Sequence, residues 1–95
     1  MPAVVGVARW VLHLPGCQSL KGKRKIVRSL RDRLRSRFEV SVAETDFQDK
    51  WQRAELCAAV VTSDRRLAES ILSRIDDHVG SDPRLFVVER ETVLY

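Results

Sequence analysis

The sequence has few cysteines and no long apolar run. Its two cysteines, Cys17 and Cys57, form no CxxC motif and are not accompanied by a histidine cluster, which argues against both a disulfide framework and a zinc site. We expect Cys57 to pack as a small hydrophobic residue, whereas Cys17, in a turn, is a candidate for exposure. No apolar stretch approaches the roughly 18 to 20 residues of a membrane span, and no charged and then apolar leader opens the chain. We therefore expect a cytoplasmic protein with no membrane partner.

The length and composition indicate one domain. Ninety-five residues can bury roughly 60 to 70% of their unfolded surface and fold around one core. The apolar fraction of 44% and the charged fraction of 32% are typical of globular proteins. Residues 1–95 are therefore predicted to form a single folded unit.

The first half of the chain is predicted to form a strand, a helix and a second strand. Residues 3–14 are rich in valine and leucine and end at a Pro–Gly pair, which is typical of a strand. Ser19 can cap a helix that runs to about Arg37. The apolar positions of this helix recur at spacings near 3.6: Leu20, Val27, Leu30, Leu34 and Phe38. From Phe38 to Ala43, apolar and polar residues alternate, which indicates a second strand.

The second half is predicted to form a strand, a helix and a last strand. A short polar turn leads into a third strand, 52–62, which should pair with the second strand as a hairpin. The next helix begins at residue 63 or 64 and stops at Gly80. Its apolar positions repeat every four residues: Leu67, Ile71, Ile75 and Val79. With a fourth strand at 84–95, the order βαββαβ predicts an α+β fold, a ferredoxin-like sandwich with a four-stranded antiparallel sheet and both helices on one face.

A family resemblance is carried by LHLPGCQSLKGKRKIVRSLRDRLRSRF from Leu12, SVAETDFQDKWQRAEL from Ser41 and AAVVTSDRR from Ala58. These stretches resemble the YlxP-like family of small uncharacterised bacterial proteins, and the likeness covers nearly the whole chain. The resemblance implies a ferredoxin-like fold and gene neighbours that encode translation initiation and ribosome maturation factors. It implies no catalytic residues. Relatives commonly have an acid, a histidine and a glycine where this chain has Gly22, Phe47 and Cys57.

The positive charge is concentrated in the first predicted helix. The net charge is +4, but Lys21–Arg37 alone holds nine basic residues and one acid. On a helical wheel, six of them share an arc of about 120° that faces away from the leucine stripe: Lys21, Arg24, Lys25, Arg28, Arg31 and Arg35. The four arginines of this set, from Arg24 to Arg35, form a ridge about 16 Å long. Like charges at i and i+4 destabilise a helix, so we interpret the ridge as functional and not as an ordinary solvated face.

A second group of cations is predicted at the helix starts. Arg65 and Arg66 lie in the first turn of the second helix, where the helix dipole disfavours positive charge. We expect both helices to start at one end of the sheet and to gather five cations there: Lys21, Lys23, Arg24, Arg65 and Arg66. Together with free backbone N–H groups, these side chains could hold a phosphate. In the alternative interpretation, both arginines point into water and pair with Glu69.

Aromatic residues are too sparse for base recognition on the sheet, because the third strand contains none. Trp10 is the one candidate stacking platform, but burial in the core is the favoured interpretation of this residue. The predicted partner is therefore structured RNA or the ribosome, contacted through the phosphate backbone. The first and third strands appear apolar on both faces, which predicts a homodimer through the open sheet face. Scattered apolar exposure on a monomer is the alternative.

Neither a metal site nor a catalytic centre is predicted. Glu44, Asp46, Asp49 and Glu55 flank the hairpin, and turn formation and pairing with Arg53 explain them better than a metal does. We expect this hairpin at the sheet end opposite the helix starts. His13 and His78 lack a partner nucleophile or base. We therefore expect a non-enzymatic binding protein without cofactor, associated with RNA or the ribosome. A dimeric regulatory module that binds a small anion is the alternative.

Overall fold

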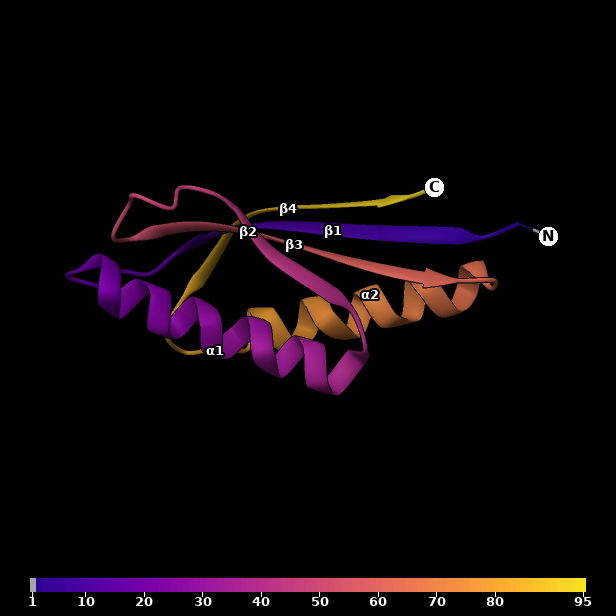
Figure 1. The fold of residues 1–95 in the computed structure, drawn as a ribbon, viewed down its shortest axis with the longest axis horizontal. Helices are drawn as coiled ribbons and strands as arrows, with labels where there is room; N and C mark the ends of the chain where they lie inside the picture. Colours follow the sequence, from indigo (N-terminus) through magenta and orange to yellow (C-terminus); the bar gives the residue numbers. More distant parts are fainter. Residues whose placement is uncertain (1) are drawn as a thin grey trace.

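The computed structural model describes residues 2–95 and contains the order βαββαβ (Figure 1). The strands and helices, in chain order, are β1 (Val4–His13), α1 (Leu20–Phe38), β2 (Ser41–Asp46), β3 (Arg53–Thr62), α2 (Arg65–Gly80) and β4 (Phe86–Leu94). The sheet order is β2-β3-β1-β4, and each neighbouring pair is antiparallel. Both helices cover one face of this sheet, which confirms the predicted ferredoxin-like α+β fold.

Capping residues determine where the helices begin and end. Ser19 Oγ accepts a hydrogen bond of 3.0 Å from the Gly22 N–H, and Asp64 Oδ1 accepts one of 2.9 Å from the Arg66 N–H. Helix α1 ends because Glu39 adopts the left-handed conformation, with φ of 50°. Phe38, predicted to open the second strand, is therefore the last residue of α1, and β2 begins only at Ser41.

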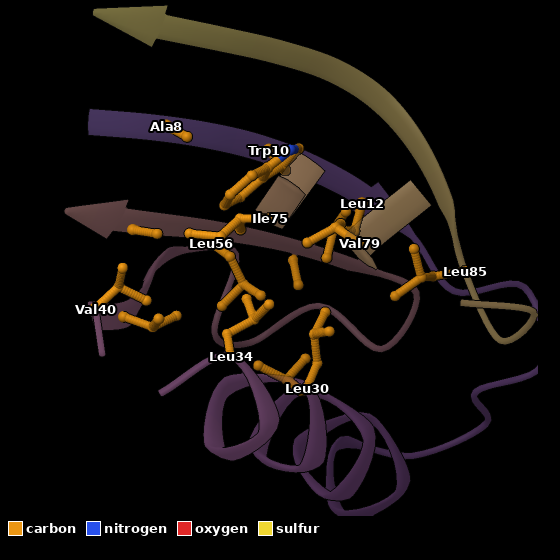
Figure 2. Packing of buried hydrophobic residues seen from close by; sticks show 14 of the residues in the cluster. Ala8, Trp10, Leu12, Leu30, Leu34, Val40, Leu56, Ile75, Val79 and Leu85 are labelled. Atoms are coloured by element: carbon orange, nitrogen blue, oxygen red, sulfur yellow. The ribbon is translucent and has the colours of Figure 1, made fainter. Parts of the chain in front are cut away.

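The core lies between the two helices and the inner face of the sheet. Figure 2 shows Leu30 and Leu34 of α1 pointing toward the sheet, where Trp10 and Leu56 lie. Trp10 is only 1% exposed, and its Nε1–H donates to Asp76 Oδ1 at 2.8 Å. It is therefore a core residue, which confirms the interpretation favoured from the sequence, and it offers no stacking platform.

The buried stripe of α2 differs from the predicted one in its first half. The buried residues are Ala68, Leu72, Ile75 and Val79. Leu67 is 49% exposed and Ile71 is only partly buried. A repeat of strictly four residues drifts around a helix of 3.6 residues per turn, so the first two predicted positions lie at the rim of the interface.

The two helices start at opposite ends of the sheet, which contradicts the prediction of a shared end. Helix α1 follows β1 and α2 follows β3, and these two strands are antiparallel, with His13 paired to Arg53 and Val4 paired to Thr62. Figure 1 shows the resulting arrangement, with the β2–β3 hairpin beside the start of α1 and not at the opposite end. The five cations predicted to meet at the helix starts are therefore divided between two ends of the molecule.

The open face of the sheet is polar in its middle and apolar at one end. Arg9 lies on this face and contacts Glu55 of β3, so the prediction that β1 and β3 are apolar on both faces is wrong at these two positions. The apolar end is built from neighbouring residues of three strands: Val5, Val7, Ala59, Val61 and Val93. Within this group, Val61 is 71% exposed.

Gly6 sets how closely α2 approaches the sheet. A Cβ at this position would lie 2.8 Å from Leu72 Cδ1 and 3.2 Å from Val60 Cγ1, and Leu72 is buried and has little room to move. We predict that Gly6→Ala lowers the free energy of unfolding by about 1 to 3 kcal/mol in denaturant titrations. The control is Gly80→Ala, whose Cβ meets nothing within 4 Å and which should be neutral or stabilising by up to about 1 kcal/mol. Equal losses in both variants would contradict the close packing at Gly6.

Candidate functional site

One side of α1 presents a row of cations to solvent. Lys21, Arg24, Lys25 and Arg28 are exposed, and Arg31 retains 33% side-chain exposure while pairing with Asp32 at 3.1 Å. We call these five cations the basic face. The first turn of α1 contains no acidic residue that would offset them. The helical wheel therefore placed these five side chains correctly.

Arg35 serves a different purpose from the rest of the predicted ridge. Its Nη2 donates a hydrogen bond of 2.7 Å to the backbone carbonyl of Val42. Because β2 is an edge strand, this contact covers an otherwise unpaired carbonyl. The free ridge is consequently shorter than predicted and runs from Arg24 to Arg31, about 10 Å along the helix axis.

The three arginines of this ridge surround a small hollow beside the sheet edge. Arg24, Arg28 and Arg31 line a cavity of 90 Å³ together with Val27 and Glu44. Guanidinium groups bind phosphate oxygens in a bidentate manner, so three of them around one hollow favour an oxyanion. The ridge thus has one point where an anion can contact more than one arginine.

Lys23 is buried and takes no part in the basic face, and the prediction that it joins a phosphate-binding group at the helix starts is wrong. Its side chain is 0% exposed, and Nζ donates to the carbonyls of Phe47 at 2.7 Å and Arg53 at 3.2 Å. Glu44 Oε2 lies 3.1 Å from Nζ, an ion pair by distance, although this oxygen accepts no well-directed hydrogen bond. A buried ammonium needs such partners, and these hold it where no external anion reaches it.

Arg65 and Arg66 lie at the far end of the molecule from the basic face. Both are exposed in the first turn of α2, and Arg65 Nε is 3.8 Å from Glu69 Oε1. This contact matches the alternative interpretation, in which the arginines point into water and pair with Glu69. An exposed pair of this kind contributes little to stability.

The sequence-based reasoning overlooked a group of exposed aromatic and basic side chains beside the start of α1. The β2–β3 hairpin and the end of β1 line an open hollow of 680 Å³ with His13, Phe47, Lys50, Trp51, Gln52 and Arg53. Trp51 is 54% exposed, and the guanidinium of Arg53 lies 4.7 Å from the centre of the Phe47 ring. The available signal was the sequence DKWQR, in which an aromatic residue is placed between cations in a loop.

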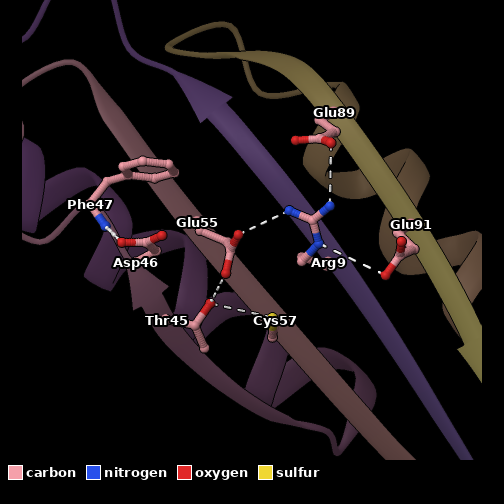
Figure 3. A network of polar contacts seen from close by, with 8 residues as sticks. All are labelled: Arg9, Thr45, Asp46, Phe47, Glu55, Cys57, Glu89 and Glu91. Carbon is pink, nitrogen blue, oxygen red and sulfur yellow. Dashed lines mark hydrogen bonds and ion pairs between the residues drawn. The ribbon is translucent and has the colours of Figure 1, made fainter.

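The acidic residues of the hairpin have structural partners. Asp46 Oδ1 accepts the Phe47 N–H at 2.7 Å, and Glu55 accepts from Thr45 at 2.6 Å and from Arg9 at 3.0 Å (Figure 3). In residues 2–95, no three histidine, cysteine, aspartate or glutamate side chains are grouped so that they could hold a metal ion. Over the same residues, neither helix is long and apolar enough to cross a membrane.

The centre of the open sheet face has more negative than positive groups. Arg9 contacts Glu89 at 3.4 Å and Glu91 at 4.0 Å in addition to Glu55. The hydrogen bond from Thr45, and then that from Arg9, hold the pKa of Glu55 below its usual value. One arginine among three glutamates leaves this face with a net negative formal charge, so it repels phosphates.

The two cysteines differ from the predictions. Cys17 is buried with 5% exposure, so it is not an accessible turn residue. Cys57 is only partly buried, on the open face, where its Sγ lies 3.4 Å from Thr45 Oγ1. It has both polar and apolar neighbours, Thr45 and Ala43 among them, and it is not part of the buried core.

Comparison with known proteins reveals two matches. The family model described as "Protein of unknown function (DUF503)" matches residues 5–92. The chain is also 32% identical over 82 residues to the "Uncharacterized protein YlxP" of Bacillus subtilis (strain 168). This alignment covers 86% of the chain and 89% of the Bacillus protein.

We predict that Lys23 is essential for stability, in contrast to the lysines of the basic face. Lys23→Met would leave Glu44 and two carbonyls without their cation, and we expect a loss of about 3 kcal/mol in the free energy of unfolding. This value is at the low end for a broken buried pair because the Glu44 side chain keeps 19% exposure. Lys25→Met, on the exposed side, should stay within about 0.5 kcal/mol of wild type in the same urea titration. A Lys23→Met protein as stable as Lys25→Met would refute the structural role.

Proposed function

This chain belongs to the DUF503 family of YlxP-like proteins, and from its own surface we propose that it binds the phosphate backbone of structured RNA through the basic face of α1. The observation that carries the proposal is a row of five exposed cations, four of which have no acidic partner. Among residues 2–95, no carboxylate lies within 4.0 Å of a charged nitrogen of Lys21, Arg24, Lys25 or Arg28.

These cations are placed against two local electrostatic preferences. Arg24 and Arg28 repel each other as like charges at i and i+4, which costs a few tenths of a kcal/mol. Lys21 and Arg24 also lie near the positive end of the α1 dipole. A polyanion relieves both costs at once, whereas water only screens them. The arrangement therefore favours a ligand with several negative charges in a row.

The distribution of charge over the molecule determines from which side a nucleic acid approaches it. The basic face lies on the helix side of the sheet, and the cluster of Arg9 with three glutamates lies on the open side. A nucleic acid is attracted to the first surface and repelled from the second. This differs from sheet-based RNA binding, in which bases stack on the open face.

The chemistry of the basic face suits phosphates and not base edges. It consists of lysines and arginines without an aromatic or amide side chain among them. Contacts of this kind fix the position of a nucleic acid and carry no sequence information. Ten ångströms of ridge faces about three phosphates of one strand at 3.4 Å per charge. Double-stranded or folded RNA, recognised by its backbone and shape, is the ligand that this surface fits.

The alternative function, a regulatory module that binds a small anion, has lost its predicted site. That site required both helix starts at one end of the sheet, and they lie at opposite ends. Arg65 and Arg66 therefore do not join Lys21 and Arg24. A polyanion spread along α1 is therefore favoured over a single small anion.

We also propose that the apolar end of the open face pairs with a second copy of the chain. Val61 at 71% exposure and Tyr95 at 72% are both large and exposed at this end. Covering them removes apolar surface from water. A two-fold arrangement would leave both basic faces on the outside and add avidity for a long RNA.

The proposed pairing can be tested by sedimentation equilibrium. We predict a dimer for the wild type at tens of micromolar and a monomer for Val61→Lys, because the new charge would be buried at the interface. The control is Leu67→Lys, which also replaces an exposed apolar residue by lysine but lies on α2, on the other side of the sheet. This variant should remain dimeric. A monomeric wild type would reject the pairing.

The proposed RNA contact predicts a specific change in salt dependence. Arg24→Gln with Arg28→Gln should reduce the magnitude of the slope of log K against log salt by about 1.8 for duplex RNA, because each lost phosphate contact releases about 0.9 fewer counterions. Arg65→Gln with Arg66→Gln removes the same charge from the far end of the molecule and should leave the slope nearly unchanged. The measurement is filter binding of duplex RNA over a salt series. Equal changes in both double variants would show a net-charge effect and contradict a site on α1.

A further inference from the structure

Two exposed aromatic residues, Trp51 and Phe86, lie at the end of the sheet where α1 starts. His13 is paired with Arg53 of β3 on one side and with Phe86 of β4 on the other, so these three residues form a row across the sheet. Phe86 is 63% exposed. Trp51 lies in the adjoining hairpin and lines the same hollow as His13 and Arg53. We call the group of His13, Phe47, Lys50, Trp51, Arg53 and Phe86 the hairpin patch.

The hollow of the hairpin patch combines flat apolar surfaces with positive charge. Its volume of 680 Å³ lies in the range of small-molecule sites. Two aromatic rings, Phe47 and Trp51, and two cations, Lys50 and Arg53, contribute to its lining, which contains no carboxylate. The patch therefore fits a ligand that is planar and aromatic on one side and anionic on the other.

The backbone of the patch is held in a demanding conformation. Phe47 has a φ of 63°, in the left-handed region that bulky residues rarely adopt. Two bonds keep it there: its N–H donates to Asp46 Oδ1 at 2.7 Å, and its carbonyl accepts from Lys23 Nζ at 2.7 Å. Strained residues of this kind persist where the surroundings fix them, and they concentrate at binding sites.

The hairpin patch adjoins the basic face. The buried Lys23 ties the first turns of α1 to the carbonyls of Phe47 and Arg53, both of which line the hollow. Lys21 and Arg24 lie in the same first turns of the helix. Figure 1 shows the hairpin and the start of α1 at one end of the molecule. One RNA strand can therefore pass from the basic face to the patch.

We propose that the hairpin patch binds an unpaired nucleotide that flanks the RNA segment held on the basic face. The inference rests on the proposed function and adds the class of RNA: a duplex joined to a single-stranded end or loop. A base stacks on the exposed ring of Trp51, and Lys50 and Arg53 contact the adjoining phosphates. Splayed, unpaired bases are the part of RNA that aromatic side chains recognise, and a duplex alone offers none.

The charge of the hollow distinguishes this occupant from others. A second copy would present its basic face, which the cations repel, or its apolar sheet end, which leaves Lys50 and Arg53 without a partner. Its third surface, the glutamates around Arg9, would pair with the cations but leave the ring of Trp51 without a stacking partner. A nucleotide satisfies both the rings and the cations of the patch. The charge complementarity together with the stacking therefore selects the nucleotide.

The experiment compares two RNA ligands with the full chain: a blunt duplex and the same duplex with a short single-stranded overhang. We expect the overhang to tighten wild-type binding by roughly 5- to 150-fold, the effect of stacking one base. Trp51→Ala should abolish this gain and leave binding to the blunt duplex unchanged, whereas Trp51→Phe should retain part of the gain. Arg24→Gln with Arg28→Gln should weaken binding to both ligands alike.

Tryptophan fluorescence gives a second readout. A base of the overhang that stacks on Trp51 should quench its emission. The quenching can be assigned to Trp51 because the other tryptophan, Trp10, is 1% exposed and inaccessible to a base. Circular dichroism of Trp51→Ala should match the wild type, since this side chain is half exposed. Quenching that rises with protein concentration in the absence of RNA would identify a second copy as the occupant and overturn the inference.

The outcomes separate the inference from the proposed function. Tight binding of the blunt duplex without a gain from the overhang, or a gain that survives Trp51→Ala, would overturn the inference alone. No binding of the duplex would overturn the proposed function. In that case, the patch is tested by titrating the protein with a short single-stranded RNA and measuring the quenching of tryptophan emission. Quenching by that strand that is lost in Trp51→Ala would support the patch, and no quenching would overturn it as well.

Discussion

The buried ammonium of Lys23 is the interaction on which the candidate surfaces depend. It comes from α1 and bonds to the carbonyls of Phe47 and Arg53, at both ends of the hairpin loop, while facing Glu44 of β2. An ammonium without such partners would be too costly to bury, so the helix and the hairpin have to meet in one geometry. That geometry positions the exposed side of α1 and the aromatic hollow at the same end of the sheet.

The sheet separates two surfaces of opposite charge. The helix side carries the basic face, and the open side carries Arg9 among three glutamates. Arg35, although part of the charged helix, is drawn to the Val42 carbonyl and protects the β2 edge from pairing with another strand. The cations of α1 therefore include one that stabilises the fold, one that covers an edge, and the five of the basic face, which a ligand can reach.

Much of the fold could be predicted because each element has a strong local signal. The 3.6-residue period identified α1, and the caps at Ser19 and Asp64 marked both helix starts. The prediction that both helices start at one end of the sheet was wrong because the strand directions were assigned incorrectly. The sequence itself contained enough information to avoid this error. In a βαββαβ chain, β2 is parallel to β1 and forms a hairpin with β3, so β1 and β3 have to be antiparallel.

The candidate site was less predictable, because it depends on contacts between distant segments. Lys23 did carry a local signal, since it precedes Val27, Leu30 and Leu34 on one helical stripe. Its charge nevertheless suggested solvent, and only the Phe47 and Arg53 carbonyls, 24 and 30 residues away, explain its burial. Trp51 had no periodic context at all. Strand pairing places His13 beside Arg53, and His13 lines the same hollow as Trp51; local patterns do not specify such pairing.

A rigid link between two weak contacts changes how strongly they act together. A few phosphate contacts on α1 give modest, salt-sensitive affinity, and one stacked base adds little by itself. When both belong to one ligand, the second contact forms at a high effective concentration, provided that the spacing between the surfaces is fixed. Lys23 fixes it, because the hairpin cannot move away from α1 without exposing a buried charge pair. Under the proposed function, a bond that contacts no ligand would therefore determine which RNA shapes can occupy both surfaces at once.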